Sequence, residues 1–256
     1  MHIPSEMLAG AVCPATAALA TAGFAGSVYA FAKSKPTVRF IAKFALVTAL
    51  VFGLQALKYP IYNGVAAHLL GGVFAVSLLG LGGGVISVAL VLGVQAFAFG
   101  DGGSSYEALS ANIFNMAIIG AGVGGLIRAA LLKRGMSSDL STAAAAFSAV
   151  MLATFALCAQ FAFGAAEPVP ASAFGALIGL HLIAAAIEVV ATVALVKIFS
   201  FDAEQAPAKV GKMKLATLAA VAVASIALGE HVLDIGSQSP DAFEYSLLGE
   251  RVELAE

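Results

Sequence analysis

Long apolar stretches separated by short polar segments dominate the pattern of hydrophobic and polar positions in this chain. A helix needs about 20 apolar residues to cross the hydrocarbon core of a bilayer. Stretches of about this length cover 7–32, 40–57, 109–132, 141–163 and 174–199. Two shorter ones, 69–81 and 85–99, meet at three consecutive glycines, and a last one covers 215–228. We therefore predict about seven membrane helices in a main domain and one further C-terminal helix.

Composition supports a chain that lies in the membrane. Of its 256 residues, 61% are hydrophobic and 11% are charged, and the mean hydropathy is +0.98. Soluble domains carry about 25% charged residues. Abundant Ala and Gly and the absence of Trp favour helices that pack closely through small residues. The sequence thus predicts an all-α polytopic integral membrane protein that is surrounded by lipid and binds no nucleic acid.

Basic residues predict the orientation of these helices. Lys58 and Arg251 are the exceptions to a distribution that places the basic loop residues on one side. Because cytoplasmic loops are enriched in Lys and Arg, that side should be cytoplasmic and the N-terminus external. His68, the loop around Asp101 and the C-terminal tail then share the external side. The residues on the cytoplasmic side are Lys33, Lys35, Arg39, Arg128, Lys133, Arg134, Lys197, Lys209, Lys212 and Lys214.

The first two residues, Met1 and His2, form a candidate metal chelate. The α-amine of Met1, the amide nitrogen of His2 and the His2 imidazole can close two fused rings on one ion and leave a fourth corner open. Planar nitrogen ligands suit Ni(II) or Cu(II), whereas Ca(II) and Mg(II) take oxygen ligands. The alternative is a histidine that follows the first methionine by chance.

His68 is the candidate for the fourth corner, because it lies where a loop enters a span on the same side as His2. We expect both histidines at the outer surface, and the alternative for His68 is an interfacial side chain that faces water. Asn112 and Asn115 open a span on this side. They either orient an imidazole by hydrogen bonding or act as helix caps and interhelical bonds.

His181 and Glu188 lie seven residues apart in the stretch 174–199, on one face of a helix. Ionisable groups inside a bilayer are costly and usually face the interior of a bundle. The pair is compatible with a proton or metal relay, or with a contact to a partner helix. We favour the simpler interpretation, in which both are hydrogen-bonded between packed helices.

Several of these motifs, taken together and in order, resemble one family. The stretches are Met1-His2-Ile3-Pro4, Ala67-His68-Leu69-Leu70-Gly71-Gly72, Gly100-Asp101-Gly102-Gly103 and Ala111-Asn112-Ile113-Phe114-Asn115-Met116-Ala117. They are similar to hallmark stretches of the CbiM/NikM family, the substrate-binding membrane components of energy-coupling-factor (ECF) transporters for cobalt and nickel. The resemblance implies a square-planar metal site made by Met1, His2 and His68. It also matches His181 and Glu188 to a His- and Glu-bearing last helix of the family.

The resemblance implies one component of an ABC-type importer, with Ni2+ or Co2+ as the transported substrate. The expected partners are a coupling membrane subunit similar to CbiQ/NikQ and an ATPase similar to CbiO/NikO. This chain has no Gly-Lys-Ser/Thr phosphate-loop ending and should bind no nucleotide, so it is not an enzyme by itself. The implied location is the cytoplasmic membrane of a bacterium or archaeon. The alternatives are a passive metal channel or a membrane metal sensor and, less favoured, an intramembrane enzyme that uses His181 and Glu188.

The end of the chain carries a second, shorter likeness. Ser239-Pro240-Asp241-Ala242-Phe243-Glu244 resembles the Pro-Asp-Gly-Leu-Glu segment of the small companion subunit CbiN/NikN, which is often fused to this component. We therefore divide the chain into a metal-binding membrane domain, 1–200, a cytoplasmic linker, 201–214, and a CbiN/NikN-like helix with an external acidic tail, 215–256. The alternative for the last part is a solvated acidic tail.

The orientation can be tested by cysteine labelling in intact cells. A cysteine placed at Ser104 should react with a membrane-impermeant thiol reagent, and one placed at Ser34 should not, because the two lie on opposite sides of the predicted layout. The parent variant would carry Ala at Cys13 and Cys158, so that only the introduced thiol is labelled. Reaction at Ser34 from outside would overturn the predicted orientation.

Overall fold

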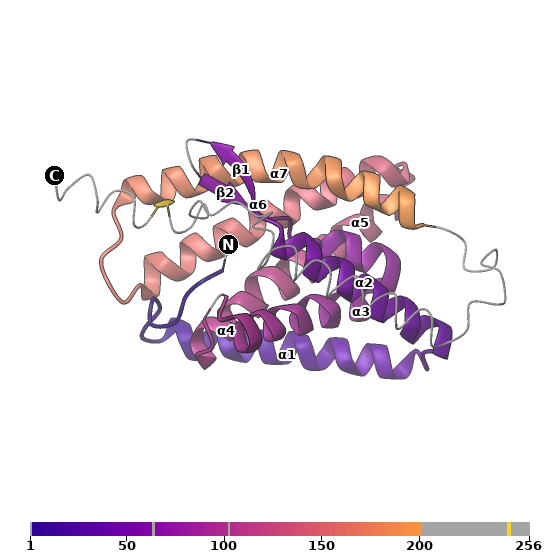
Figure 1. The fold of residues 1–256 in the computed structure, drawn as a ribbon, viewed down its shortest axis with the longest axis horizontal. Coiled ribbons are helices and arrows are strands. Elements are labelled where there is room, and N and C mark those ends of the chain that lie inside the picture. Colours follow the sequence, from indigo (N-terminus) through magenta and orange to yellow (C-terminus); the bar gives the residue numbers. More distant parts are fainter. Residues whose placement is uncertain (1, 63–64, 102, 201–244, 247–256) are drawn as a thin grey trace.

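Helices make up most of the computed structural model, which describes residues 2–62, 65–101, 103–200 and 245–246. Within these residues, six helices are long and apolar enough to cross a membrane, and they form one bundle (Figure 1). The prediction of an all-α polytopic membrane protein is thereby confirmed. The predicted linker 201–214 and the predicted helix at 215–228 lie outside the described residues.

The elements follow one another with short connections. Thr37, Ser105 and Ser137 begin three of the helices as N-caps, each accepting a hydrogen bond from a backbone N–H of the first turn. A small antiparallel hairpin, β1 (Tyr59–Tyr62) and β2 (Val65–Ala67), pairs Tyr59 with Ala67. The helices are α1 (Val12–Lys33), α2 (Val38–Ala56), α3 (Gly72–Val94) with its π-helical continuation η1 (Gln95–Phe99), α4 (Tyr106–Asn112) with π-helical η2 (Ile113–Val123) and α5 (Gly124–Lys133), α6 (Ser138–Gly164) and α7 (Ala171–Phe199).

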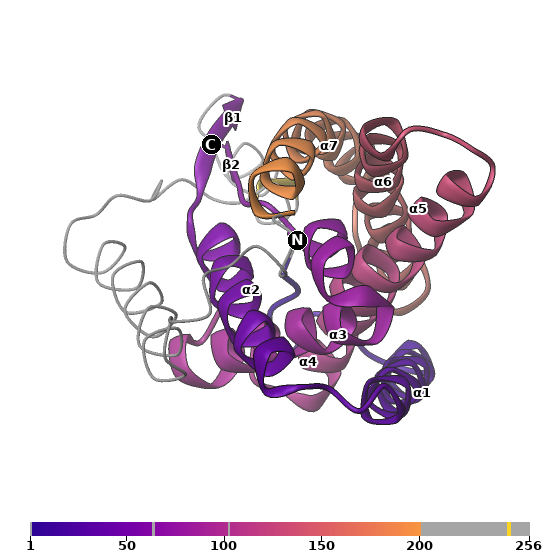
Figure 2. The same ribbon diagram turned by 90° about the vertical axis from the view of Figure 1, so that its right-hand side faces the viewer.

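The helix α3 forms the centre of the bundle. In its most apolar window 72% of the residues are buried, against 17% in that of α1, which lies at the periphery. Figure 2, which looks along the bundle, shows the other helices arranged around α3. Phe74, Val88 and Val91 are among its most deeply buried side chains. Gly72 lets the start of α3 approach η2, because an added Cβ would lie 2.9 Å from the backbone nitrogen of Ala121.

The helix α3 is not one straight rod but folds back on itself at Gly80. That residue has φ 72° and ψ 172°, a conformation open essentially to glycine. A Cβ added to Gly84 would lie 2.6 Å from the backbone nitrogen of Val76, although eight residues of straight helix would span about 12 Å. The predicted short spans 69–81 and 85–99 are therefore the two arms of one element. The seven membrane helices predicted for the main domain are therefore six among the described residues. The break lies at Gly80 and not at residues 82–84, where we predicted it.

One end of the bundle is basic. Lys33, Lys133 and Lys197 lie in the last turns of α1, α5 and α7. Lys197 Nζ lies 2.6 Å from a carboxylate oxygen of Asp139 in the first turn of α6, which places the two helix ends side by side. The turn of α3 lies near this end, where Gly82 faces Ser27 and Phe31 of α1, and its second arm runs back from there toward the Asp101 loop. We call the opposite end, with the β-hairpin and the Asp101 loop, the histidine end.

The reversal of α3 predicts an unequal response of two glycines to the same substitution. Gly80→Ala should lower the free energy of unfolding by about 1–3 kcal/mol, because alanine is strained at this φ and ψ. Gly93→Ala is the matched control: Gly93 lies in the same helix without a positive φ, with nothing within 4 Å of an added Cβ. It should be neutral or stabilise the protein by about 0.5–1 kcal/mol. Thermal unfolding in detergent measures both, and equal losses would argue against the strained turn.

Candidate metal centre

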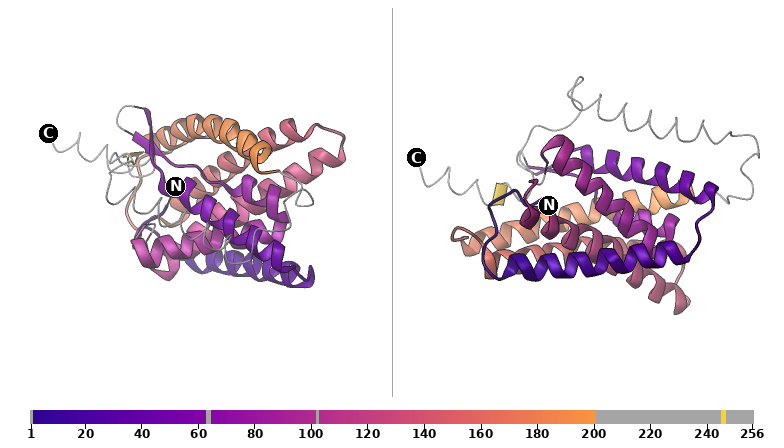
Figure 3. Two further views of the ribbon diagram at one scale, coloured as in Figure 1. Left: turned by 45° about the vertical axis from the view of Figure 1, so that its right-hand side comes forward. Right: turned by 90° about the horizontal axis from the view of Figure 1, so that it is seen from below.

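The N-terminal segment, residues 2–9, runs back from the start of α1 into the bundle (Figures 1 and 3). Ile3 is fully buried in the main hydrophobic core. Its N–H donates to Asn112 Oδ1 at 2.8 Å, and Asn112 Nδ2 donates to the Ile3 carbonyl at 3.1 Å. A side-chain amide thus satisfies both backbone groups of Ile3, as a neighbouring β-strand would. Asn112 therefore sets the position of His2, the preceding residue.

Several further contacts hold the same segment. The Asp101 loop packs directly on it, because a Cβ added to Gly103 would lie 2.3 Å from the backbone nitrogen of Ser5. Ser5 Oγ accepts a hydrogen bond from the N–H of Ser105. Farther along, Ala9 N–H donates to the Gly164 carbonyl at 2.7 Å, and Leu8 forms a bridge with Ala165. The segment is consequently anchored to α4, to the Asp101 loop and to the end of α6.

His68 follows directly after β2 and precedes the first turn of α3. Its Nδ1 lies 3.2 Å from the carbonyl oxygen of Leu69. Because a carbonyl oxygen can only accept, Nδ1 carries the proton in the neutral imidazole and the lone pair is on Nε2. The ring is therefore prepared to offer Nε2 to an ion.

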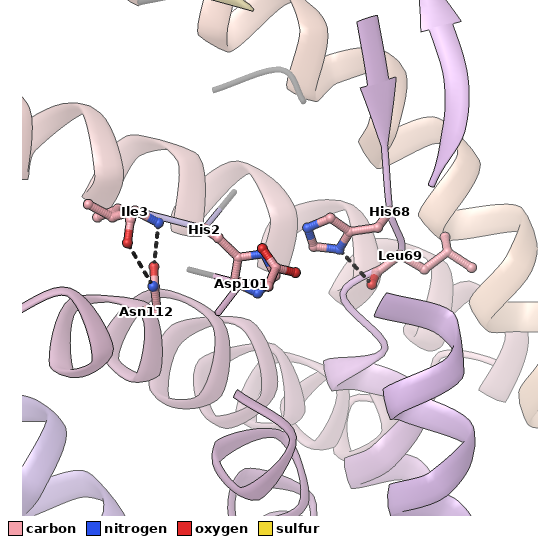
Figure 4. Close-up of polar contacts among 6 residues, drawn as sticks. All are labelled: His2, Ile3, His68, Leu69, Asp101 and Asn112. Atoms are coloured by element: carbon pink, nitrogen blue, oxygen red, sulfur yellow. Dashed lines mark hydrogen bonds and ion pairs between the residues drawn. The ribbon is translucent and has the colours of Figure 1, made fainter. Parts of the chain in front are cut away.

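The two predicted histidines come together, although 66 residues separate them in sequence (Figure 4). The ring centroids of His2 and His68 are 4.9 Å apart, with 25° between their planes. Only 6% of His2 and 5% of His68 is exposed, so the expectation of two surface histidines is wrong. The cause is the depth to which the N-terminal segment and the loop before α3 enter the bundle. Met1, the third predicted ligand residue, lies outside the described residues.

Asp101 joins this pair, and the sequence interpretation missed it. Its Oδ1 lies 3.6 Å from His2 Nδ1, and its N–H donates to the carbonyl of Gln95. Burial alone would raise the pKa of the Asp101 carboxyl, but His2, His68 and Lys58 outweigh burial and hold that pKa below its usual range. The carboxylate is thus ionised at neutral pH and favours a cation here. The available signal was an acidic residue among glycines on the same side as His2.

The remaining predicted site residues make other contacts. Asn115 exchanges two hydrogen bonds with Gln160, of 2.8 and 3.1 Å, and so joins η2 to α6. The ring of His181 binds the Leu177 carbonyl of its own helix at 2.8 Å. Glu188 accepts hydrogen bonds from the N–H groups of Leu70 and Gly71, two and three residues after His68. Asn112 and Glu188 therefore border the candidate site, whereas Asn115 joins two helices and His181 bonds to its own helix.

The donor set that the structure describes is rich in nitrogen. It comprises the two imidazoles and, beside them, the Asp101 carboxylate. Among the described residues, no group of three or more His, Cys, Asp and Glu side chains is arranged to hold a metal ion. Planar sets of nitrogen ligands favour Ni(II) and Cu(II).

Comparison with known proteins points to metal transport. Residues 2–206 match the family model CbiM, described as "Cobalt uptake substrate-specific transmembrane region". A putative fused nickel transport protein NikMN of Archaeoglobus fulgidus is 31% identical over 233 residues, which cover 88% of this chain and 75% of that protein. A putative metal transport protein of Haloquadratum walsbyi is 37% identical over 132 residues, or 50% of this chain and 58% of that protein.

Solved structures show the same arrangement. The crystal structure of a truncated transition metal transporter has a TM-score of 0.68 and 28% sequence identity, covering 78% of this chain and 98% of that one. A second crystal structure of a transition metal transporter gives the same score and identity and is covered to 92%. The similarity therefore extends over most of the described bundle.

The packing of the Asp101 loop on the N-terminal segment predicts different effects at two glycines with similar backbones. Gly100 and Gly103 have φ of 71° and 68°, but only at Gly103 would a Cβ collide with Ser5. Gly103→Ala should displace the segment and speed exchange of the Ile3 amide, because a Cβ and a backbone atom cannot lie 2.3 Å apart. Gly100→Ala carries the same strain without the collision and should change this exchange little. Hydrogen–deuterium exchange of the N-terminal peptide distinguishes the two, and equal exchange in both variants would contradict the packing argument.

Proposed function

The chain belongs to the CbiM family of cobalt- and nickel-transport membrane components, and on this basis we propose that it is the substrate-binding component of an ECF-type importer for Ni(II) or Co(II). It is a transport component and not an enzyme. The names of its relatives, which include nickel transport proteins, support this choice of substrate. The observation that carries the proposal is the meeting of His2 and His68 deep in the bundle, with rings 4.9 Å apart.

The proposed ion lies in a plane of four nitrogens. These are the α-amine of Met1, the amide nitrogen and imidazole of His2, and Nε2 of His68. The Ile3 bonds to Asn112 support this geometry, since they fix the backbone that carries two of the ligands. Because Asn112 makes these bonds, we assign it the role of orienting the ligands of His2. Residues with this role commonly contribute 10- to 100-fold to metal affinity.

Charge and protons shape the affinity of such a site. A divalent ion that displaces protons from an amine, an amide and an imidazole binds more weakly as the pH falls through the range where amine and imidazole become protonated. The Asp101 carboxylate beside His2 offsets part of the positive charge of the bound ion. Affinity should thus be highest at neutral to mildly alkaline pH.

Transport energy has to come from other chains in this proposal. The glycine-rich stretch 100–105 lacks the Lys of a phosphate-binding loop, and no Gly-Lys-Ser/Thr occurs in the sequence. We assign ATP hydrolysis to a separate ATPase and its coupling to a second membrane subunit. For residues 239–244, outside the described part, we retain the likeness to the CbiN/NikN companion. The fused relative from Archaeoglobus fulgidus, aligned over 88% of this chain, supports it.

A blocked N-terminus provides the test of the site. Acetylation of the α-amine, or an uncleaved tag ahead of Met1, removes one nitrogen ligand and should weaken Ni(II) or Co(II) binding by at least about 100-fold. His2→Ala and His68→Ala should have the same effect, because each removes an imidazole. A C-terminal tag is the control and should leave binding unchanged. Metal titration of detergent-solubilised protein measures all four, and normal affinity with a blocked amine would refute the planar set.

A further inference from the structure

Glu188 binds the backbone of the loop that carries His68, a contact that simple packing of two helices would not need. Its Oε2 accepts the Leu70 N–H at 2.8 Å and its Oε1 accepts the Gly71 N–H at 3.0 Å, while Thr192 Oγ1 donates to Oε1 at 3.3 Å. Glu188 is 3% exposed and lies within the membrane helix α7. The two backbone groups belong to the loop that carries His68. Leu70 of this loop is 118 residues from Glu188 along the chain.

The use of a carboxylate at this place is informative. Acidic residues inside membrane helices are expensive and are kept mainly where they serve function. A carboxylate offers two acceptor oxygens, and two parallel N–H bonds fix direction as well as distance. The bonded groups also lie at the N-terminus of α3, where unpaired N–H groups favour a negative charge. Glu188 therefore fixes the position and the direction of the loop, in addition to holding α7 against α3.

The other side of the same loop is held as well. Gln55 of α2 donates from Nε2 to the Leu70 carbonyl at 2.8 Å. The Leu70 residue is thus bound through its N–H by α7 and through its carbonyl by α2. Gly71, with φ 67°, makes the turn into α3. The imidazole of His68 lies only two residues before this fixed point, so it has little freedom of its own.

We propose that Glu188 is the positioning residue for His68, and that α7 controls metal affinity through it. The inference rests on the proposed function, since it assumes that His68 binds the ion. With the Leu70 and Gly71 bonds intact, His68 stands opposite His2 and closes the site.

The test compares Glu188→Gln with His181→Gln. Glutamine keeps the size of Glu188 but turns one acceptor into a donor, which faces a backbone N–H and cannot bond to it. We expect Ni(II) to bind about 10- to 100-fold more weakly, as for other residues that orient a ligand. The absorption spectrum should move from that of planar to that of six-coordinate Ni(II). His181, also buried in α7 and bonded to Leu177 of its own helix, is the control and should leave affinity and spectrum as in the parent.

Each outcome decides between the proposals. Unchanged Ni(II) affinity and an unchanged spectrum in Glu188→Gln would overturn the positioning role. The role would also be overturned if His181→Gln weakened Ni(II) binding as much as Glu188→Gln does and both variants had lower melting temperatures. If Glu188→Gln does not fold, Glu188→Asp replaces it, because the shorter side chain keeps both acceptor oxygens but withdraws them from the Leu70 and Gly71 N–H groups, and parental affinity and spectrum would then reject the idea. A parent protein that binds no Ni(II) would instead refute the proposed function itself.

Discussion

Irregular backbone inside a membrane bundle must find every hydrogen-bond partner within the protein, because lipid offers none. Two such stretches enter this bundle, the N-terminal segment and the loop before α3, and each meets a side chain suited to a peptide group. Asn112 binds both backbone groups of Ile3, and Glu188 with Gln55 binds both of Leu70. The residues that solve this problem of solvation are the ones that bring His2 and His68 face to face.

The reversal of α3 at Gly80 provides the room for this arrangement. A straight helix over Gly72–Phe99 would carry Asp101 to the basic end, far from His68. The folded element instead returns Asp101 to within 3.6 Å of His2. The tip of the turn packs against α1, where a Cβ on Gly82 would lie 2.8 Å from the Ser27 carbonyl. The core of the bundle and the candidate site are thus built by one helix with two arms.

Much of this architecture could be predicted from hydrophobic periodicity, because apolar length sets the helices and basic residues mark their ends. The glycines at 82–84 indicated a break within a few residues of the observed one at Gly80. The roles of Asn112 and Glu188 could not be predicted, since amides and carboxylates suit caps, helix pairs and loops equally well. Their partners, Ile3 and Leu70, lie more than 100 residues away and offer only backbone atoms, which leave no mark in a sequence. Burial of the histidines escaped prediction for the same reason.

The anchoring of residues 2–9 also has a consequence in time. These residues are synthesised long before some of their partners, which extend to Ala165 and Ala166 at the end of α6. At synthesis rates of about 5–20 residues per second, roughly ten to thirty seconds pass before all of those partners exist. The segment 2–9 therefore reaches its final place only after α6 has been made. Ile3, fully buried in the finished bundle, stays accessible during this interval, and closure of the bundle ends it.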